Sequence, residues 1–170
     1  TYVVERNRKN EFDKDLYPKF GSLGVLGQTV KTHGGSGTSN LAYGIVAYEF
    51  EKIDSSYRSS ISVQSSLVIH PISEFGSEEQ KDKYLPELIK GEKIGCFGLT
   101  ESEAGSDPAS MKTTFKKTKD GYILNGSKNW ITNAPIADIF IIWAIEEGKD
   151  HKNIRGFILE KNNEGLNIST

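Results

Sequence analysis

Two short polar segments are the best candidates in this 170-residue sequence for binding a cofactor or substrate. The first is Gly98-Leu99-Thr100-Glu101, with Ala104-Gly105-Ser106-Asp107 just after it. Here a predicted strand ends in a hydroxyl and a carboxylate, and a glycine loop follows. Such a sheet edge can offer backbone N–H groups and hydroxyls to a polar cofactor. The alternative is an ordinary connection whose Ser and Asp side chains only satisfy turn backbone.

The second segment is Trp130-Ile131-Thr132-Asn133. On a predicted strand over 128–132, Trp130 and Thr132 face the same way, because side chains alternate along a strand. A flat aromatic wall beside a hydroxyl donor suits a planar heteroaromatic ring. Trp130 could equally fill a hydrophobic core.

Metal and nucleophile chemistry have little support. The sequence has no HExxH motif, no paired histidines and no G-x-S-x-G elbow. We expect His70, which precedes Pro71, to be a hydrogen-bonded core histidine. Cys96 is the single cysteine, so an internal disulfide is impossible, and its apolar neighbours predict a buried, inert thiol.

Composition narrows the class of protein further. The net charge of -2 and the pI of about 5.9 argue against a nucleic-acid surface, which usually carries a basic excess. The longest apolar run, 139–145, is too short to cross a bilayer. We therefore expect no nucleic-acid partner and no membrane insertion.

The first half of the chain, 11–91, is predicted to be helical. Apolar residues recur at helical spacing from Leu41 to Ile53, and Ser39 or Asn40 can cap the start of that helix. A second, buried helix over 61–72 should be kinked or locally unwound by Pro71. Ser77 and Gln80 fit a capping box at the start of a third helix, which Gly91 should end.

From residue 94 the pattern changes to short strands, which we predict over 94–100, 113–119, 122–124, 128–132, 139–145 and 154–161. Asp120-Gly121 and Asn125-Gly126 are turn signals, and the second is predicted to form a hairpin. Helices followed by strands indicate an α+β fold. We expect a helical domain over 1–92 and a β domain over 93–170, arranged as an antiparallel β-barrel or, alternatively, a sandwich.

Taken together, these segments resemble the acyl-CoA dehydrogenase family. Its signature stretches match residues 96–101, 104–107 and 128–133 in order and spacing. Three further stretches, 23–27, 54–59 and 62–72, are similar to glutaryl-CoA dehydrogenases in particular. Ser102-Glu103 departs from the Pro-Asn that close relatives often have there.

The resemblance implies three domains: an N-terminal helical domain, a middle β domain and a C-terminal four-helix bundle. This sequence matches the first two, with the first helix cut short, and does not include the bundle. The family's catalytic glutamate usually lies on that bundle, so we assign no catalytic residue in this chain.

The resemblance also implies site residues for FAD and for an acyl-CoA substrate. Thr132 would donate a hydrogen bond to flavin N5, Trp130 would pack against the ring system, and Ser106 would reach the pantetheine or CoA part of the substrate. The remaining cofactor-binding residues would be Phe97, Leu99, Thr100 and Ile131. For glutaryl-CoA, Arg58 would bind the distal carboxylate, with Ser59 adding a hydrogen bond.

Helical spacing supports a partner for that arginine. Glu51 lies seven residues before Arg58, two turns along a predicted single helix, with Ser55 between them on the same face. Solvated surface charges are the alternative.

The implied reaction is FAD-dependent α,β-dehydrogenation of an acyl-CoA. With glutaryl-CoA the glutaconyl intermediate then loses carbon dioxide and gives crotonyl-CoA. The implied partners are an electron-transferring flavoprotein and three further copies in a homotetramer. The implied location is the cytoplasm of a bacterium or the mitochondrial matrix of a eukaryote. The alternatives are a short- or branched-chain acyl-CoA dehydrogenase, or a non-catalytic module of the same fold.

Overall fold

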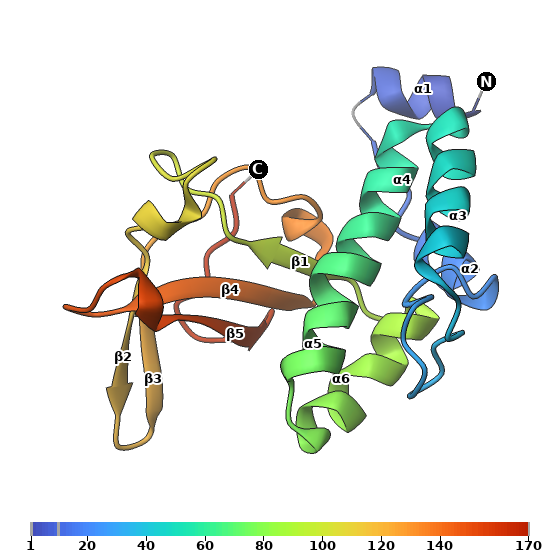
Figure 1. Cartoon of the computed structure of the whole chain (residues 1–170). Coiled ribbons are helices and arrows are strands. Elements are labelled where there is room, and N and C mark those ends of the chain that lie inside the picture. The colour runs from blue at the N-terminus through green and yellow to red at the C-terminus, as the bar shows by residue number, and fades with distance from the viewer. Residues whose placement is uncertain (1, 10, 170) are drawn as a thin grey trace. The chain divides into compact units, whose positions relative to one another are not determined.

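The computed structural model describes residues 2–9 and 11–169. The chain divides into two compact units, Thr1–Ile94 and Gly95–Thr170 (Figure 1). The first unit is helical and the second contains a sheet, as the sequence pattern predicted. None of the described helices has both the length and the apolar composition needed to span a bilayer.

The helical unit surrounds a core that includes Tyr17, Leu26, Val68, Leu85 and Leu88, all fully buried. Its described elements are α1 (Tyr2–Arg8), α2 (Leu16–Ser22), α3 (Asn40–Ile53), α4 (Ser55–Ser62), the π-helical stretch η1 (Val63–Ile69), α5 (His70–Phe75) and α6 (Glu78–Lys90).

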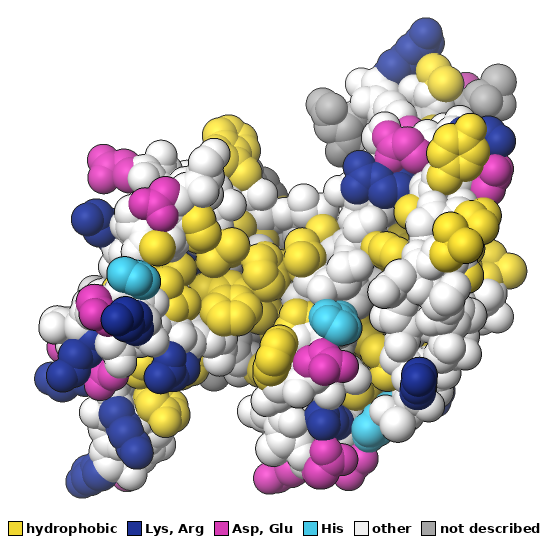
Figure 2. Space-filling view, in the orientation of Figure 1, with side chains coloured by type: hydrophobic (Ala, Val, Ile, Leu, Met, Phe, Trp, Pro, Cys, Tyr) yellow, Lys and Arg dark blue, Asp and Glu magenta, His cyan; other side chains and the backbone are white. Residues whose placement is uncertain are grey.

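Helix α3 begins where the sequence predicted, because the Ser39 hydroxyl accepts a hydrogen bond from the Ala42 backbone N–H at 3.2 Å. Its apolar residues do not form a core, however. No residue of α3 is buried, and Leu41, Ile45 and Tyr48 are exposed. Figure 2 shows hydrophobic side chains gathered at the surface over this helix.

Pro71 does not interrupt the helical run. Ile69 and His70 keep right-handed helical torsions, and α4, η1 and α5 follow one another from Ser55 to Phe75. The predicted local unwinding takes the form of a changed hydrogen-bond register, since the seven residues before α5 are π-helical. A π turn displaces the carbonyl that a proline ring would otherwise meet, so the helical path can continue.

The caps of α6 match the sequence signals. Ser77 and Gln80 form both hydrogen bonds of a capping box, at 2.9 and 3.2 Å. Gly91 ends the helix with φ of 72°, a left-handed conformation that favours glycine. A Cβ at Gly91 would also lie 2.1 Å from the carbonyl oxygen of Tyr17.

The second unit has a five-stranded sheet with β1 (Gly95–Gly98), β2 (Thr114–Thr118), β3 (Gly121–Asn125), β4 (Ile139–Glu146) and β5 (Ile154–Glu160). The predicted antiparallel arrangement is wrong, because β4 pairs in parallel with both β1 and β2. The β2–β3 and β4–β5 pairs are antiparallel. The alternation of side chains along a strand does not show whether two paired strands run parallel or antiparallel. A long connection, such as the one from β1 to β4, permits either direction.

Two local predictions in this unit are also wrong. The hairpin forms at Asp120-Gly121, between β2 and β3, and Asn125-Gly126 instead ends β3. Residues 128–132 are not a strand, because the backbone there turns through a positive φ at Trp130. A cluster of Cys96, Ala137 and Phe140 forms a buried core beside this loop. Cys96 is fully buried, as predicted, and burial raises the pKa of its thiol to about 12.

Candidate functional site

The first candidate segment leaves the sheet at the end of β1. Phe97, on the strand, makes an edge-on contact with Trp143, with ring centroids 5.9 Å apart. Leu99 and Thr100 follow the strand and are half-buried. Gly98 is tightly enclosed, since a Cβ there would lie 2.5 Å from Ile142 Cδ1. The strand end is therefore fixed, while the two residues after it reach the surface.

Glu101 is buried directly after this segment and accepts three hydrogen bonds. Its Oε1 accepts from Lys128 Nζ at 2.7 Å and from the Thr113 backbone N–H at 3.0 Å. Its Oε2 accepts from the Lys112 backbone N–H at 2.6 Å. Burial alone would raise the pKa of Glu101, but these hydrogen bonds outweigh it, Lys128 most of all, and lower the pKa to about 2. Glu101 is thus ionised and not poised as a general base.

The second candidate segment is the loop over residues 128–133. Trp130 has φ of 59° and is 91% exposed. A bulky residue with positive φ is a backbone outlier, and such strain often lies at functional sites. The Trp130 side chain makes no hydrogen bond or ring contact with any residue that the structure describes. An indole held outward on a strained backbone is suited to contact a partner.

The side chains of the three residues that follow Trp130 have different surroundings. Thr132 is exposed, so its hydroxyl is accessible. Ile131 packs against the Cys96 core cluster, which leaves its side chain directed into the unit. Asn133, with φ of 71°, donates from Nδ2 to the Gly95 carbonyl at 3.1 Å and anchors the end of the loop.

The glycine loop after Glu101 is exposed, including Ser106. Within the described residues, the side chains of Ser106 and Asp107 make no hydrogen bond, so they do not satisfy turn backbone as the alternative interpretation required. Turn contacts come from Ser110 instead, whose hydroxyl donates to the Asp107 carbonyl at 2.8 Å.

In the helical unit the structure brings Glu51, Ser55 and Arg58 together. Arg58 Nε donates to Glu51 Oε2 at 2.6 Å, and the Ser55 hydroxyl donates to Glu51 Oε1 at 2.6 Å. The single helix that we predicted for these residues is wrong. Asp54 is extended between α3 and α4, because its carboxylate caps α4 by accepting from the Ser56 backbone N–H at 2.8 Å.

This cluster is partly exposed to solvent. The side chains of Arg58 and Glu51 are 37% and 45% exposed. Hydrogen bonds from Ser55 and then from Arg58 lower the pKa of Glu51, so it is ionised at neutral pH. Arg58 Nη1 and Nη2 have no partner among the described residues, and Ser59 lies half-buried beside Arg58 in the sequence.

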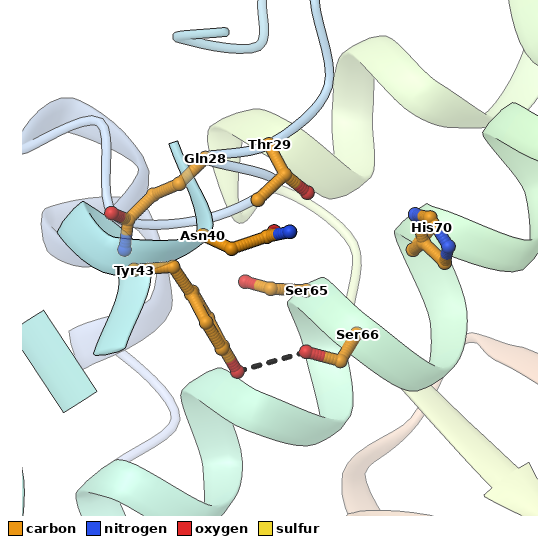
Figure 3. A pocket seen from close by; sticks show the side chains of 7 residues that line it. All are labelled: Gln28, Thr29, Asn40, Tyr43, Ser65, Ser66 and His70. Carbon is orange, nitrogen blue, oxygen red and sulfur yellow. Dashed lines mark hydrogen bonds between the residues drawn. The ribbon is translucent and has the colours of Figure 1, made fainter. Parts of the chain in front are cut away.

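A separate pocket of about 200 Å³ lies in the helical unit (Figure 3). It is lined by polar residues that include Asn40, Tyr43 and His70, and the Ser66 hydroxyl donates to Tyr43 Oη at 2.8 Å. None of our predicted site residues lines it. His70 is exposed and its ring makes no hydrogen bond within the described part of the chain, so the expectation of a core histidine is wrong.

The Glu101–Lys128 pair is a feature that our reading of the sequence missed. Both residues lie inside the matched motifs, but they are 27 positions apart and nothing local links them. The sequence did offer one indication of the pair: the 96–101 motif contains one acidic residue, Glu101, and the 128–133 motif contains one basic residue, Lys128.

These features suit a flat, partly polar ligand better than a metal. Within the residues described, no cluster of three or more His, Cys, Asp or Glu side chains could hold a metal ion. The sheet unit instead offers an exposed indole, accessible Thr hydroxyls and an exposed glycine loop. That donor set is suited to a heteroaromatic ring with hydrogen-bonding edges.

Comparison with known families and proteins gives a consistent result. Residues 1–92 match the family model "Acyl-CoA dehydrogenase, N-terminal domain", and residues 96–170 match "Acyl-CoA dehydrogenase, middle domain". A short-chain-specific acyl-CoA dehydrogenase from Megasphaera elsdenii is 41% identical, over 96% of this chain and 44% of its own length. The mitochondrial isovaleryl-CoA dehydrogenase of Pongo abelii is 40% identical, over 97% of this chain and 40% of its own length.

Among solved structures, the glutaryl-CoA dehydrogenase of Mycobacterium smegmatis in complex with FADH2 superposes with a TM-score of 0.86. It is 44% identical, and the match covers 91% of this chain and 39% of that one. The chain therefore spans less than half the length of the relatives it matches.

Proposed function

Because this chain belongs to the acyl-CoA dehydrogenase family, we propose that it binds FAD through residues 97–106 and 130–132 and serves the dehydrogenation of an acyl-CoA. The observation that carries this proposal is the Trp130 side chain, 91% exposed on a strained backbone. Packing of its ring against the flavin would cover that surface. A relative of known structure contains FADH2, which supports the same cofactor.

Each accessible residue then has a definite role. Thr132 donates a hydrogen bond to flavin N5, and Phe97, Leu99 and Thr100 line the ring. Ser106 contacts the pantetheine or CoA part of the substrate. Ile131, whose side chain packs into the core, contributes through its backbone position. When bound, FAD would supply the acceptor for the hydride from the substrate β carbon, while the α proton would go to the family's catalytic glutamate outside this chain. Thr132, held at the ring, would favour the hydride transfer by preorganisation.

The test is a Trp130→Ala/Thr132→Ala double variant of the full-length protein. We expect weaker FAD binding and slower flavin reduction, measured by flavin content and stopped-flow absorbance. Both residues are exposed, so the fold should be retained. The substitution Tyr122→Ala, at another exposed aromatic residue of the sheet unit, is the control. Wild-type flavin content and reduction rate in the double variant would overturn the assignment.

For the substrate, we propose glutaryl-CoA, with Arg58 binding its distal carboxylate and Ser59 adding a hydrogen bond. The support is geometric: Glu51 holds Arg58 through Nε, which leaves the two terminal amino groups for a second carboxylate. Ser55 holds Glu51 in turn. A carboxylate bound by a guanidinium forms a charge-assisted hydrogen bond, whereas an apolar acyl chain gains nothing from this cation.

Arg58→Ala in the full-length enzyme tests the substrate. We expect kcat/KM for glutaryl-CoA to fall much further than kcat/KM for a monocarboxylic acyl-CoA of similar length. Loss of a charge-assisted pair costs about 2–5 kcal/mol when the complex is desolvated. Equal losses with both substrates would make Arg58 a structural residue and would favour the short- or branched-chain alternative.

That alternative has direct support, because the relatives include short-chain and isovaleryl-CoA dehydrogenases. A non-catalytic module is the third possibility, which flavin absorbance of the purified full-length protein would separate from the enzymes. An electron-transferring flavoprotein as the electron acceptor, and a homotetramer, also stay predictions from the family resemblance.

A further inference from the structure

The buried Glu101–Lys128 ion pair joins the two segments to which we assign flavin binding. Lys128 Nζ donates to Glu101 Oε1 at 2.7 Å and to the Leu99 carbonyl at 3.0 Å. The next residue, Asn129, donates its backbone N–H to the Thr100 carbonyl at 2.9 Å. Each of the three consecutive residues 99–101 is therefore held by either Lys128 or Asn129.

The loop beyond this junction is held at its other end as well. Asn133 Nδ2 donates to the carbonyl of Gly95, at the start of β1. Trp130 and Thr132 lie between the two anchors. The side chain that anchors the near end, Lys128, precedes Trp130 by two residues, so a shift of the pair would move the indole and the Thr100 hydroxyl relative to one another.

Stability alone is a poor reason for such a pair. Both side chains are only 7% exposed, and two charges withdrawn from water cost about as much as their attraction returns. Apolar side chains of similar size are often as stable in such positions. What an ion pair adds is a fixed distance and direction between two segments, together with the carboxylate contacts to Lys112 and Thr113.

We propose that Glu101 and Lys128 are positioning residues, which fix the register between the 99–101 segment and the 128–133 loop so that both meet the flavin in one geometry. This inference rests on the proposed function, since it presumes that these two segments bind FAD. Neither residue contacts the cofactor or takes part in proton transfer in this role.

The experiment uses the full-length, FAD-loaded protein with the double substitution Glu101→Gln/Lys128→Met. Removing both charges leaves no buried charge unpaired, so this variant should unfold at higher denaturant concentration than Lys128→Met alone. We expect its FAD Kd to rise about 10–100-fold, the range that outer-shell partners contribute at metal sites. The absorption fine structure and midpoint potential of the bound flavin should change as well.

Glu87→Gln is the matched control, because Glu87 and Lys93 form an ion pair of the same 2.7 Å length at a more exposed position. It should leave the flavin properties unchanged. A folded double variant with wild-type Kd, spectrum and potential would overturn the inference.

Two further outcomes are separable. If Trp130→Ala/Thr132→Ala also leaves FAD binding unchanged, the proposed function fails and this inference fails with it. If that variant loses FAD but the Glu101→Gln/Lys128→Met variant does not, only the positioning role is wrong. If the Glu101→Gln/Lys128→Met variant does not fold, Lys128→Arg replaces it, because arginine keeps the charge but alters the geometry of the pair. A higher FAD Kd at an unchanged unfolding midpoint would support the positioning role. A wild-type FAD Kd would overturn it.

Discussion

The two units each contain a carboxylate–cation pair at almost the same distance, but in opposite surroundings. Glu101 and Lys128 lie 2.7 Å apart and are each 7% exposed, whereas Glu51 and Arg58 lie 2.6 Å apart and are 45% and 37% exposed. Within the sheet unit, the Glu101 carboxylate accepts three hydrogen bonds and Lys128 Nζ donates two. The second leaves the terminal amino groups of Arg58 accessible to a ligand.

The comparison teaches that pairs of nearly equal length can differ greatly in burial, and that burial decides how far water and ligands can compete for the two ions. A buried pair is screened little by solvent, and loss of one partner leaves an uncompensated charge. An exposed pair contributes little to folding because water competes for both ions. Under the proposed substrate assignment, such a pair would accept a substrate carboxylate without loss of the fold.

The largest effect that separates the two regions is expected for Lys128→Met. The substitution leaves the buried Glu101 carboxylate without its cation, and breaking such a pair costs about 3–5 kcal/mol. Chemical denaturation of the full-length protein should show this loss in the free energy of unfolding. A loss no greater than that of Glu87→Gln would show that solvent reaches the Glu101 site.

The next effect is a pH dependence of stability that should be larger for the buried pair, because the pKa of Glu51 is also lowered but that carboxylate is exposed to water. The pKa of Glu101 is about 2 in the folded protein against an ordinary value of 4.5, so ionised Glu101 stabilises the fold above pH 4.5. That contribution, about 3 kcal/mol, is lost as the pH falls from 4.5 through 2. The difference in unfolding free energy between wild type and Glu101→Gln should shrink over this range. If the unfolding free energies of wild type and Glu101→Gln kept a constant difference down to pH 2, the lowered pKa of Glu101 would be contradicted.

The smallest effect is expected for Glu51→Gln. Because the Glu51–Arg58 pair is exposed, the midpoint of thermal unfolding should stay within experimental error of wild type. Glu49→Gln, which disrupts the exposed pair with Lys52 on the same helix, is the matched control. A clearly lower midpoint of thermal unfolding for Glu51→Gln, but not for Glu49→Gln, would mean that the Glu51–Arg58 pair also stabilises the fold.

The sequence by itself determined the features that depend on a few neighbouring residues. The Ser39 cap, the Ser77–Gln80 capping box and the left-handed Gly91 all form as predicted. The turn at Asp120-Gly121 also forms there. In each case neighbouring residues decide the structure: a side chain accepts a hydrogen bond from a nearby backbone N–H, or a glycine adopts the φ angle that the turn or helix end requires. No distant part of the chain is needed.

The candidate residues were likewise found from local motifs, but their geometry was not. A strand over 128–132 was predicted from side-chain types, whereas the backbone turns at Trp130 and Asn133 because anchors at Thr100 and Gly95 hold the loop at both ends. Glu51 and Arg58 do meet, yet across a break at Asp54 and not along one helix.

Only the tertiary structure decided which strands run in parallel and which charges pair. β1 meets β4 across some 40 residues of chain, and Glu101 meets Lys128 across 27. Such contacts depend on which segments share a core and on the burial they produce together. For that reason the sequence revealed Glu101 and Lys128 as members of two motifs, and folding alone made them one ion pair.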